Sequence, residues 1–319
     1  MDISATRPEA APHLARGYLI CIIGTAFLST TAIFIRYLTL TYQLPPLVLA
    51  FWRAAFVVMA LLLVFAVANP ARLKLERRHL GFLALFGLEM SLFNSLWTTS
   101  VALNGAAVAT VLAYSSAAFT AILGWWLLHE HLGLIKIIAV SLSILGCVFV
   151  SGAYDPANWQ VNALGILTGL LTGLTYAGYT LLGRSASQRG LNPWTTLLYS
   201  FTFAVPFLLL YNLFPEWLPA GVASTNLFWL DGEWVGWLVL IALAVGPTIA
   251  GFGLYITSLS YLPASVVNII ATLEPVMTGL LAFILLSERF SGPQWVGSAL
   301  ILGGIMVLRL SEGRLVKVS

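Results

Sequence analysis

Apolar runs of about 20 residues, separated by short breaks rich in Pro, Asn and Gly, make up most of this chain. A run of that length crosses the hydrocarbon core of a bilayer as one helix. Of the 319 residues, 60% are hydrophobic and 8% are charged, whereas a soluble domain is about 25% charged. A soluble fold would lack the polar residues to cover so much apolar surface. The sequence therefore predicts an all-α polytopic membrane protein with ten transmembrane helices, surrounded by the lipid bilayer.

The basic residues predict how the chain is oriented. With both termini in the cytoplasm, the outer loops carry only Arg36 and Arg289, while the other Lys and Arg residues of the loops and tails face inward. This asymmetry follows the positive-inside rule. We therefore expect a multi-pass protein of the cell inner (plasma) membrane, with cytoplasmic tails at residues 1–16 and 311–319.

The two halves of the chain resemble each other. Residues 96–130 align with residues 254–288, and Glu130 falls on Glu288. Each half holds five spans, an odd number, so tandem copies must cross the bilayer in opposite directions.

This repeat predicts the domain organisation. We expect a first five-helix repeat at 17–151, a connecting loop at 152–161 and a second five-helix repeat at 162–310. Two inverted repeats around a central cavity suit alternating access, because the halves can open to either side at comparable energy.

The spacing from Pro275 to Glu288, followed by Gly297 and Gly303-Gly304, resembles the EamA repeat of the drug/metabolite transporter superfamily. The family ends the fourth helix of each repeat with Gly-Glu, whereas this chain has His129-Glu130 and Ser287-Glu288. Ala117 stands where a proline is expected opposite Pro275. The resemblance implies a secondary carrier, often an exporter of amino acids or other small metabolites.

Three ionisable residues lie well inside predicted spans: Arg53, Glu89 and Glu274. Such residues usually face a bundle interior or a wet cavity. Glu274 is followed by Pro275, which frees a backbone carbonyl one turn earlier and predicts a kinked gating helix. Glu274 is alternatively a carboxylic acid kept neutral by burial. Arg53 pairs with one of the acids, or holds a substrate carboxylate by a bidentate contact. The candidates for coupling or gating are Arg53, Glu89, Glu274 and Pro275.

Aromatic and amide side chains at similar depth complete the predicted cavity. Tyrosine hydroxyls buried in a membrane need a hydrogen-bond partner, and small-molecule sites are mostly apolar with a few convergent polar groups. Packing between helices is the alternative interpretation of these aromatic residues. The predicted substrate-binding residues are Asn94, Trp97, Tyr114, Tyr176, Tyr179, Tyr199, Tyr255 and Asn268.

Other functions are disfavoured by the sequence. It contains no phosphate-binding loop, dinucleotide fingerprint or hydrolase elbow in a suitable context, so we expect neither an enzyme nor a cofactor. His129-Glu130-His131 diverges on a helix, so no metal site is expected, and no basic stripe indicates nucleic acid. The sequence predicts export of amino acids, including those with aromatic or bulky apolar side chains, or of related small metabolites. The alternatives are a multidrug or organic-cation exporter and a sugar-phosphate or nucleotide-sugar carrier. A monomer is compatible with the sequence.

Overall fold

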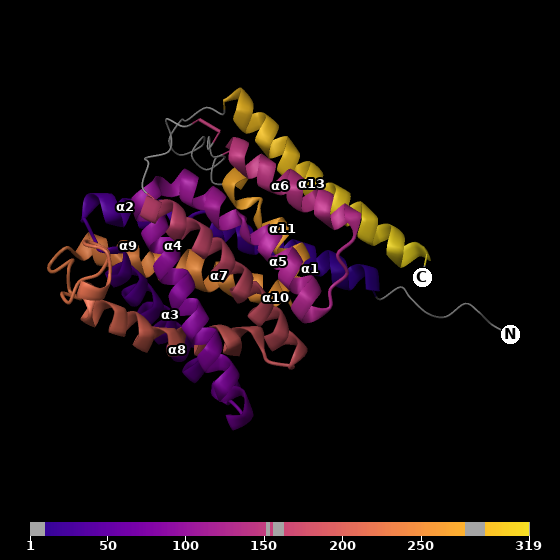
Figure 1. Ribbon diagram of the computed structural model, residues 1–319. Helices are drawn as coiled ribbons and strands as arrows, with labels where there is room; N and C mark the ends of the chain where they lie inside the picture. Colours follow the sequence, from indigo (N-terminus) through magenta and orange to yellow (C-terminus); the bar gives the residue numbers. More distant parts are fainter. Residues whose placement is uncertain (1–9, 151–153, 156–162, 278–290, 319) are drawn as a thin grey trace.

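The computed structural model describes residues 10–150, 154–155, 163–277 and 291–318 (Figure 1). Within these ranges the chain folds into helices and no strand is assigned, as the composition predicts. Six helical segments of this part are long and apolar enough to cross a membrane. The chain is therefore a multi-pass helical membrane protein. The six segments are Leu14–Thr41, Pro46–Ala68, Arg77–Leu103, Leu164–Gln188, Pro193–Leu213 and Trp234–Ser258.

The bounds of the described helices are as follows. The α-helices are α1 (Ala10–Leu28), α2 (Thr31–Thr41), α3 (Pro46–Ala68), α4 (Leu80–Tyr114), α5 (Ser116–Leu128), α6 (Leu134–Val150), α7 (Ala163–Gln188), α8 (Pro193–Leu213), α9 (Trp234–Leu243), α10 (Gly253–Ser258), α11 (Ala264–Ala271) and α13 (Gly292–Val318). Short 3-10 turns lie at η1 (Pro70–Leu73), η2 (Arg77–His79) and η4 (Pro215–Trp217), and η5 (Ala244–Phe252) is a π-helix.

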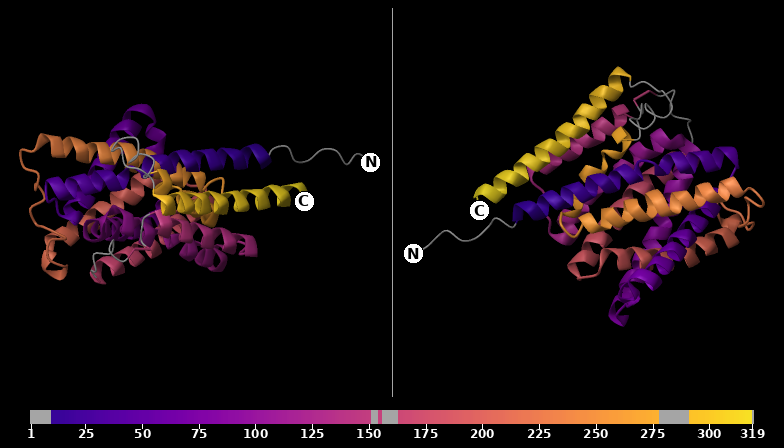
Figure 2. Two further views of the ribbon diagram at one scale, coloured as in Figure 1. Left: turned by 90° about the horizontal axis from the view of Figure 1, so that it is seen from above. Right: turned by 180° about the vertical axis from the view of Figure 1, so that it is seen from behind.

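The helix pair α4 and α7 forms the centre of the bundle, with α3 and α8 on one side. Helices α6 and α13 run side by side at the opposite margin (Figures 1 and 2). Close approach at the centre depends on glycine: a Cβ added to Gly169 of α7 would overlap the side chain of Leu112, and one added to Gly173 would overlap Ser115. Small residues therefore let α7 press against α4 and the start of α5.

The beginning of α1 and the end of α13 lie at the same end of the bundle (Figures 1 and 2). This end also carries the connections α3–α4 and α7–α8, whose basic residues include Arg72, Lys74 and Arg189. We call it the basic end. The opposite end carries the long connection from α8 to α9, which is fixed in part by Trp52 Nε1 donating to Leu227 O at 2.6 Å.

Three helix boundaries differ from the sequence-based expectation. Helix α1 begins at Ala10, so the later part of the expected N-terminal tail is helical, and α13 continues through the expected C-terminal tail to Val318. Helix α4 runs through Asn104-Gly105, where the sequence predicts a break. An Asn-Gly pair in a helix interior costs only about 1–2 kcal/mol, which packing against neighbouring helices offsets. The break comes instead at Ser115.

Several helices are interrupted at mid-depth, and their freed backbone groups are satisfied locally. Between α1 and α2, Ser29 Oγ donates to Ala26 O at 2.7 Å and Thr30 Oγ1 to Phe27 O at 2.8 Å. Pro247 lies inside the π-helix η5 and cannot donate to Leu243 O as an α-helix would require, and Thr248 Oγ1 donates to this carbonyl at 2.8 Å. Irregular backbone at membrane depth is tolerated where protein encloses it.

Candidate functional site

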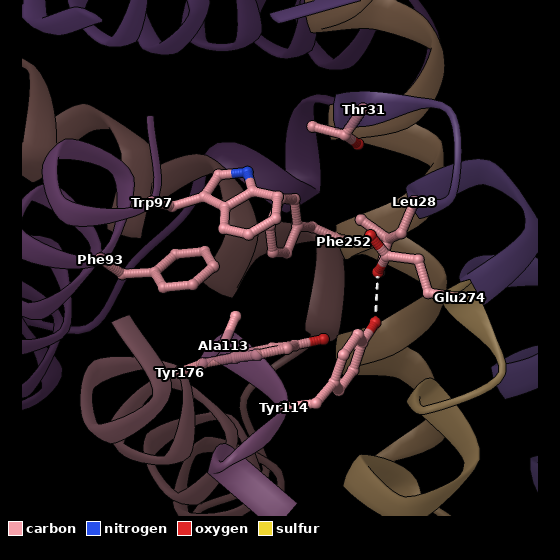
Figure 3. A pocket seen from close by; sticks show the side chains of 9 residues that line it. All are labelled: Leu28, Thr31, Phe93, Trp97, Ala113, Tyr114, Tyr176, Phe252 and Glu274. Atoms are coloured by element: carbon pink, nitrogen blue, oxygen red, sulfur yellow. Dashed lines mark hydrogen bonds between the residues drawn. The ribbon is translucent and has the colours of Figure 1, made fainter. Parts of the chain in front are cut away.

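A narrow cavity lies where these interruptions meet. Its volume is about 30 Å³, room for little more than one or two water molecules. Small-molecule sites usually exceed roughly 300 Å³, so the cavity in this structure is too small to enclose an amino acid. The lining side chains come from α1, α2, α4, α7, η5 and the turn after α11 (Figure 3). They are Leu28, Thr31, Phe93, Trp97, Ala113, Tyr114, Tyr176, Phe252 and Glu274.

Glu274 supplies the acidic group of the cavity. Helix α11 ends at Ala271, and the turn at Thr272-Leu273 delivers Glu274 to the cavity wall. Tyr114, at the end of α4, donates its hydroxyl to Glu274 Oε2 at 2.6 Å (Figure 3). The residue is 8% exposed, and Oε2 has this single side-chain donor. A carboxyl group in this position is enclosed by protein, yet it retains capacity to bind another donor.

Aromatic rings form the floor of the cavity toward the basic end. Tyr176 lies 5.2 Å from Phe93 and 5.7 Å from Tyr255, measured between ring centroids. Tyr179 packs edge-on against Phe252 at 5.3 Å. Such tilted and edge-to-face contacts are the favoured aromatic geometries. The structure thus brings Trp97, Tyr114 and Tyr176 to the cavity wall and places Tyr179 and Tyr255 in the layer beneath it.

Asn268 of α11 joins this layer through hydrogen bonds. Its Oδ1 accepts from Ser116 Oγ at 3.0 Å, and its Nδ2 donates to Thr180 Oγ1 at 3.3 Å. The Thr180 hydroxyl in turn lies 2.7 Å from the Tyr255 hydroxyl. The network connects α5, α7, α10 and α11 beneath the cavity, so Asn268 holds the floor together and does not itself line the cavity.

Arg53 and Asn94 form a separate polar pair between α3 and α4. The Arg53 guanidinium donates from Nη2 to Asn94 Oδ1, and Asn94 Nδ2 donates to Met90 O at 2.8 Å. Arg53 is 1% exposed, and its Nε and Nη1 have no hydrogen-bond partner in the part of the chain that the structure describes. Among the described residues no carboxylate pairs with it. The expected ion pair with Glu89 or Glu274 is therefore absent from this conformation.

Glu89 of α4 faces α7 at some distance from the cavity lining. Its carboxyl group lies against Gly178 and Tyr179, and neither oxygen makes a hydrogen bond of normal geometry with a described residue. A charged carboxylate would be costly here, because both oxygens are enclosed. The structure therefore separates the three ionisable residues that the sequence groups together.

Tyr199, a predicted substrate-binding residue, does not line the cavity in this structure. Its hydroxyl donates at 2.7 Å to Leu73 O, in the α3–α4 connection at the basic end. Tyr199 is six residues from the start of α8 at Pro193, so it lies only about 9 Å along the helix from the basic end. Pro275 lies next to Glu274 and is buried, and the turn that precedes it is the expected helix interruption.

The sequence did not indicate five of the nine residues that line the cavity. Leu28 and Thr31 lie at the break between α1 and α2, and Phe93, Ala113 and Phe252 are apolar residues among many. The run Ser29-Thr30-Thr31 inside an apolar span was the available signal for the break. No comparable signal distinguishes Phe93 or Phe252 from ordinary core residues.

Glu130, which aligns with Glu288 in the repeat, makes several polar contacts at the basic end. Its Oε1 accepts from Ala264 N at 2.8 Å, and its Oε2 accepts from Ser265 Oγ at 2.6 Å. Lys136 Nζ lies 3.5 Å from the same Oε2. A carboxylate at a helix N-terminus is stabilised by the free N–H groups and the helix dipole. Glu130 therefore fixes the start of α11, the helix that carries Asn268 and leads to Glu274.

Two stretches of the chain, residues 15–152 and 163–310, each match the EamA-like transporter family. The chain belongs to this family of transporters. As a family member it acts on a small-molecule substrate in a membrane.

The relatives named below align with this chain over most of their length. The chain is 28% identical to "Uncharacterized transporter YwfM" of Bacillus subtilis over 269 residues, which are 82% of this chain and 84% of the relative. It is 27% identical to "Probable amino-acid metabolite efflux pump" of Escherichia coli over 277 residues, 83% of this chain and 86% of the relative. A solved structure titled "Crystal structure of protein" shares the fold with a TM-score of 0.73 at 19% identity, covering 94% of this chain and 99% of that one.

Proposed function

We propose that this EamA-like protein is a secondary transporter that exports amino acids, bulky apolar or aromatic ones above all, or closely related metabolites, by alternating access. The observation that carries the proposal is the Glu274–Tyr114 pair on the wall of an aromatic cavity where broken helices meet. The carboxylate offers a counter-charge to a substrate ammonium group, and the rings offer an apolar surface to a side chain.

The architecture that we propose is ten spans in two inverted five-helix repeats. Two observations support it: the family match falls twice on the chain, and helix interruptions occur in both halves around one cavity. The basic residues at the end shared by the start of α1 and the end of α13 support cytoplasmic termini and an inner-membrane location. Alternating access requires the narrow cavity to widen toward one side of the membrane and then toward the other.

The substrate class is supported by the named relatives and by the charge of the cavity. Two relatives are called probable amino-acid metabolite efflux pumps, each at 27% identity. A sugar-phosphate or nucleotide-sugar would need cations in the cavity, yet the described lining contains a carboxyl group and no Lys or Arg. An organic-cation exporter remains the second candidate, because an acid flanked by aromatic rings also suits a cation.

Counterflow into proteoliposomes tests the proposal. Vesicles containing the purified full-length chain are loaded with an unlabelled compound, and uptake of labelled phenylalanine, leucine, alanine, tetraphenylphosphonium and glucose-6-phosphate is followed. We expect saturable exchange of phenylalanine and leucine, with weaker exchange of alanine. Exchange of tetraphenylphosphonium without any amino acid would overturn the proposal in favour of the organic-cation exporter.

A further inference from the structure

A second pocket opens at the basic end, between the α3–α4 connection and the α7–α8 connection. Its volume is about 460 Å³, many times that of the central cavity. The pocket is separate from the Glu274 site and shares no lining residue with it. Its walls are Asn69, Ala71, Arg72, Lys74, Leu75, Glu76, Arg78, His79, Arg189, Gly190, Leu191, Asn192 and Thr195.

The pocket carries a strong excess of positive charge. Four of its lining residues are Arg or Lys and one is an acid, Glu76. Arg78 Nε lies 2.7 Å from Glu76 Oε2, so that acid is already occupied. Arg72, Lys74 and Arg189 have no described carboxylate partner. The uncompensated charge indicates an anionic ligand.

Two guanidinium groups of the pocket and one of its walls are oriented by contacts within the protein. Arg189 lies over the Phe82 ring, 4.6 Å from its centroid, and Arg72 lies over Phe65 at 5.6 Å. The α3–α4 connection is tied to α8 by Thr195 Oγ1 donating to Arg72 O at 3.0 Å. Because the guanidinium groups are oriented by these contacts, less conformational entropy is lost when they bind an anion.

The surroundings of the pocket favour a ligand with an apolar part. The last turns of α3 just above it expose apolar side chains, among them Leu63, Val64 and Val67, the last of these 81% exposed. In a membrane protein such side chains contact acyl chains. An anionic headgroup in the pocket and acyl chains along α3 would belong to one molecule.

We propose that this pocket binds the phosphate-bearing headgroup of an anionic phospholipid. Arg72 and Arg189 contact the phosphate from the two connections, and Lys74 contributes charge at the mouth. Basic pockets between transmembrane helices on the cytoplasmic side are suited to such headgroups. Occupation by the lipid joins the α3–α4 connection to the α7–α8 connection and stabilises that end of the bundle.

The test compares lipids by thermal unfolding and by native mass spectrometry of the full-length chain in detergent. We expect dioleoyl phosphatidylglycerol to raise the midpoint of unfolding and to be retained at one copy, whereas dioleoyl phosphatidylcholine does neither. The double substitution Arg72→Gln with Arg189→Gln should weaken phosphatidylglycerol binding about 25-fold, about fivefold for each cation removed. Arg189→Lys, which keeps the charge, should retain more of the binding than Arg189→Gln.

Arg77→Gln is the matched control, because Arg77 is an exposed basic residue of the same connection that does not line the pocket. An equal loss of binding in Arg77→Gln would show diffuse attraction of anionic lipid and overturn the proposal. A second comparison uses inorganic phosphate in place of lipid, at concentrations matched to the lipid. If phosphate alone raises the midpoint of unfolding, the pocket is a site for a soluble anion and the lipid assignment is overturned. If the double variant unfolds in detergent, the single variant Arg189→Gln is tested instead. Its retention of phosphatidylglycerol in native mass spectrometry then supports or overturns the proposal.

Discussion

The carboxyl groups of Glu130 and Glu274 lie at the two ends of the short helix α11, and they differ in how fully their oxygens are hydrogen-bonded. Glu130, at the start of α11, accepts hydrogen bonds from Ala264 N and Ser265 Oγ and lies near Lys136. Glu274, just beyond the end of α11, receives one hydrogen bond, from Tyr114, although it is the more deeply placed. A carboxylate that the protein satisfies completely stabilises the fold, whereas one left partly unsatisfied is available to a ligand.

The comparison leads to opposite expectations for the same chemical change, Glu to Gln. At Glu274 the change should remove a charge that a substrate uses and leave the fold intact. At Glu130 the change should remove a charge that stabilises the fold. It should lower the free energy of unfolding and affect transport only through that loss of stability. The predictions below run from the largest expected effect to the smallest.

Glu274→Gln should lower phenylalanine counterflow in proteoliposomes by roughly 10- to 100-fold, because a hydrogen bond to a charged group contributes about 1.5–3 kcal/mol. The amide can still accept from the Tyr114 hydroxyl, so the midpoint of thermal unfolding should stay near that of the wild type. Counterflow above half of the wild-type rate would show that the substrate does not use this carboxylate, and the contrast with Glu130 would be lost.

Glu130→Gln should lower the free energy of unfolding by about 2–3 kcal/mol, since hydrogen bonds from a helix N-terminus and a nearby ammonium group lose their charged acceptor. Equilibrium unfolding in mixed micelles with increasing dodecyl sulfate measures the change. Glu76→Gln is the matched control: its partner Arg78 is 72% exposed, and an exposed ion pair contributes about 0–1 kcal/mol. Equal losses in the two variants would mean that Glu130 contributes no more than a surface pair.

Tyr114→Phe should reduce counterflow about 3- to 10-fold, because the phenol orients the Glu274 carboxyl group and its loss removes one hydrogen bond of about 1 kcal/mol. Tyr199→Phe removes a comparable hydroxyl whose bond is to Leu73 O at the basic end. We expect this control to lose a similar amount of stability and to keep wild-type transport. Should Tyr199→Phe impair counterflow as strongly, the exclusion of Tyr199 from the transport path would be wrong.

The helical class and the family could be predicted from the sequence because both depend on features that are visible along the chain. Apolar runs long enough for a bilayer require helices whatever their packing. The spacing of Pro275, Glu288 and the glycines identifies the repeat. Glu274, Tyr114, Tyr176 and Trp97 line the cavity, and the sequence could single them out because a polar or bulky aromatic group deep in a span is unusual.

What the sequence could not provide was the direction in which each side chain points. Arg53, Glu89 and Glu274 have similar depth, yet Arg53 meets Asn94, Glu89 faces Gly178, and Glu274 alone reaches the cavity. In a helix buried on all sides, apolar periodicity does not reveal which face borders the cavity, because every face is apolar. Phe93 and Phe252 were missed for the same reason, and the position of Tyr199 along α8 does not reveal that its hydroxyl donates to Leu73 O at the basic end.

The turn that delivers Glu130 to α11 provides the smallest and most local test. His129 ends α5 with φ of 54° and ψ of 31°, the left-handed conformation that glycine adopts without strain, and the family's usual Gly-Glu places glycine there. We expect His129→Gly to raise the free energy of unfolding by about 0.5–1 kcal/mol, the relief of left-handed strain less the added freedom of the unfolded chain. Gly190 gives the reverse control: its φ is 75° and no atom lies within 4 Å of an added Cβ, so Gly190→Ala should lower stability by about 1 kcal/mol through backbone strain alone. A loss of stability in His129→Gly would show that the imidazole makes a contact that outweighs the strain, and that the position of Glu130 depends on this side chain as well as on the shape of the turn.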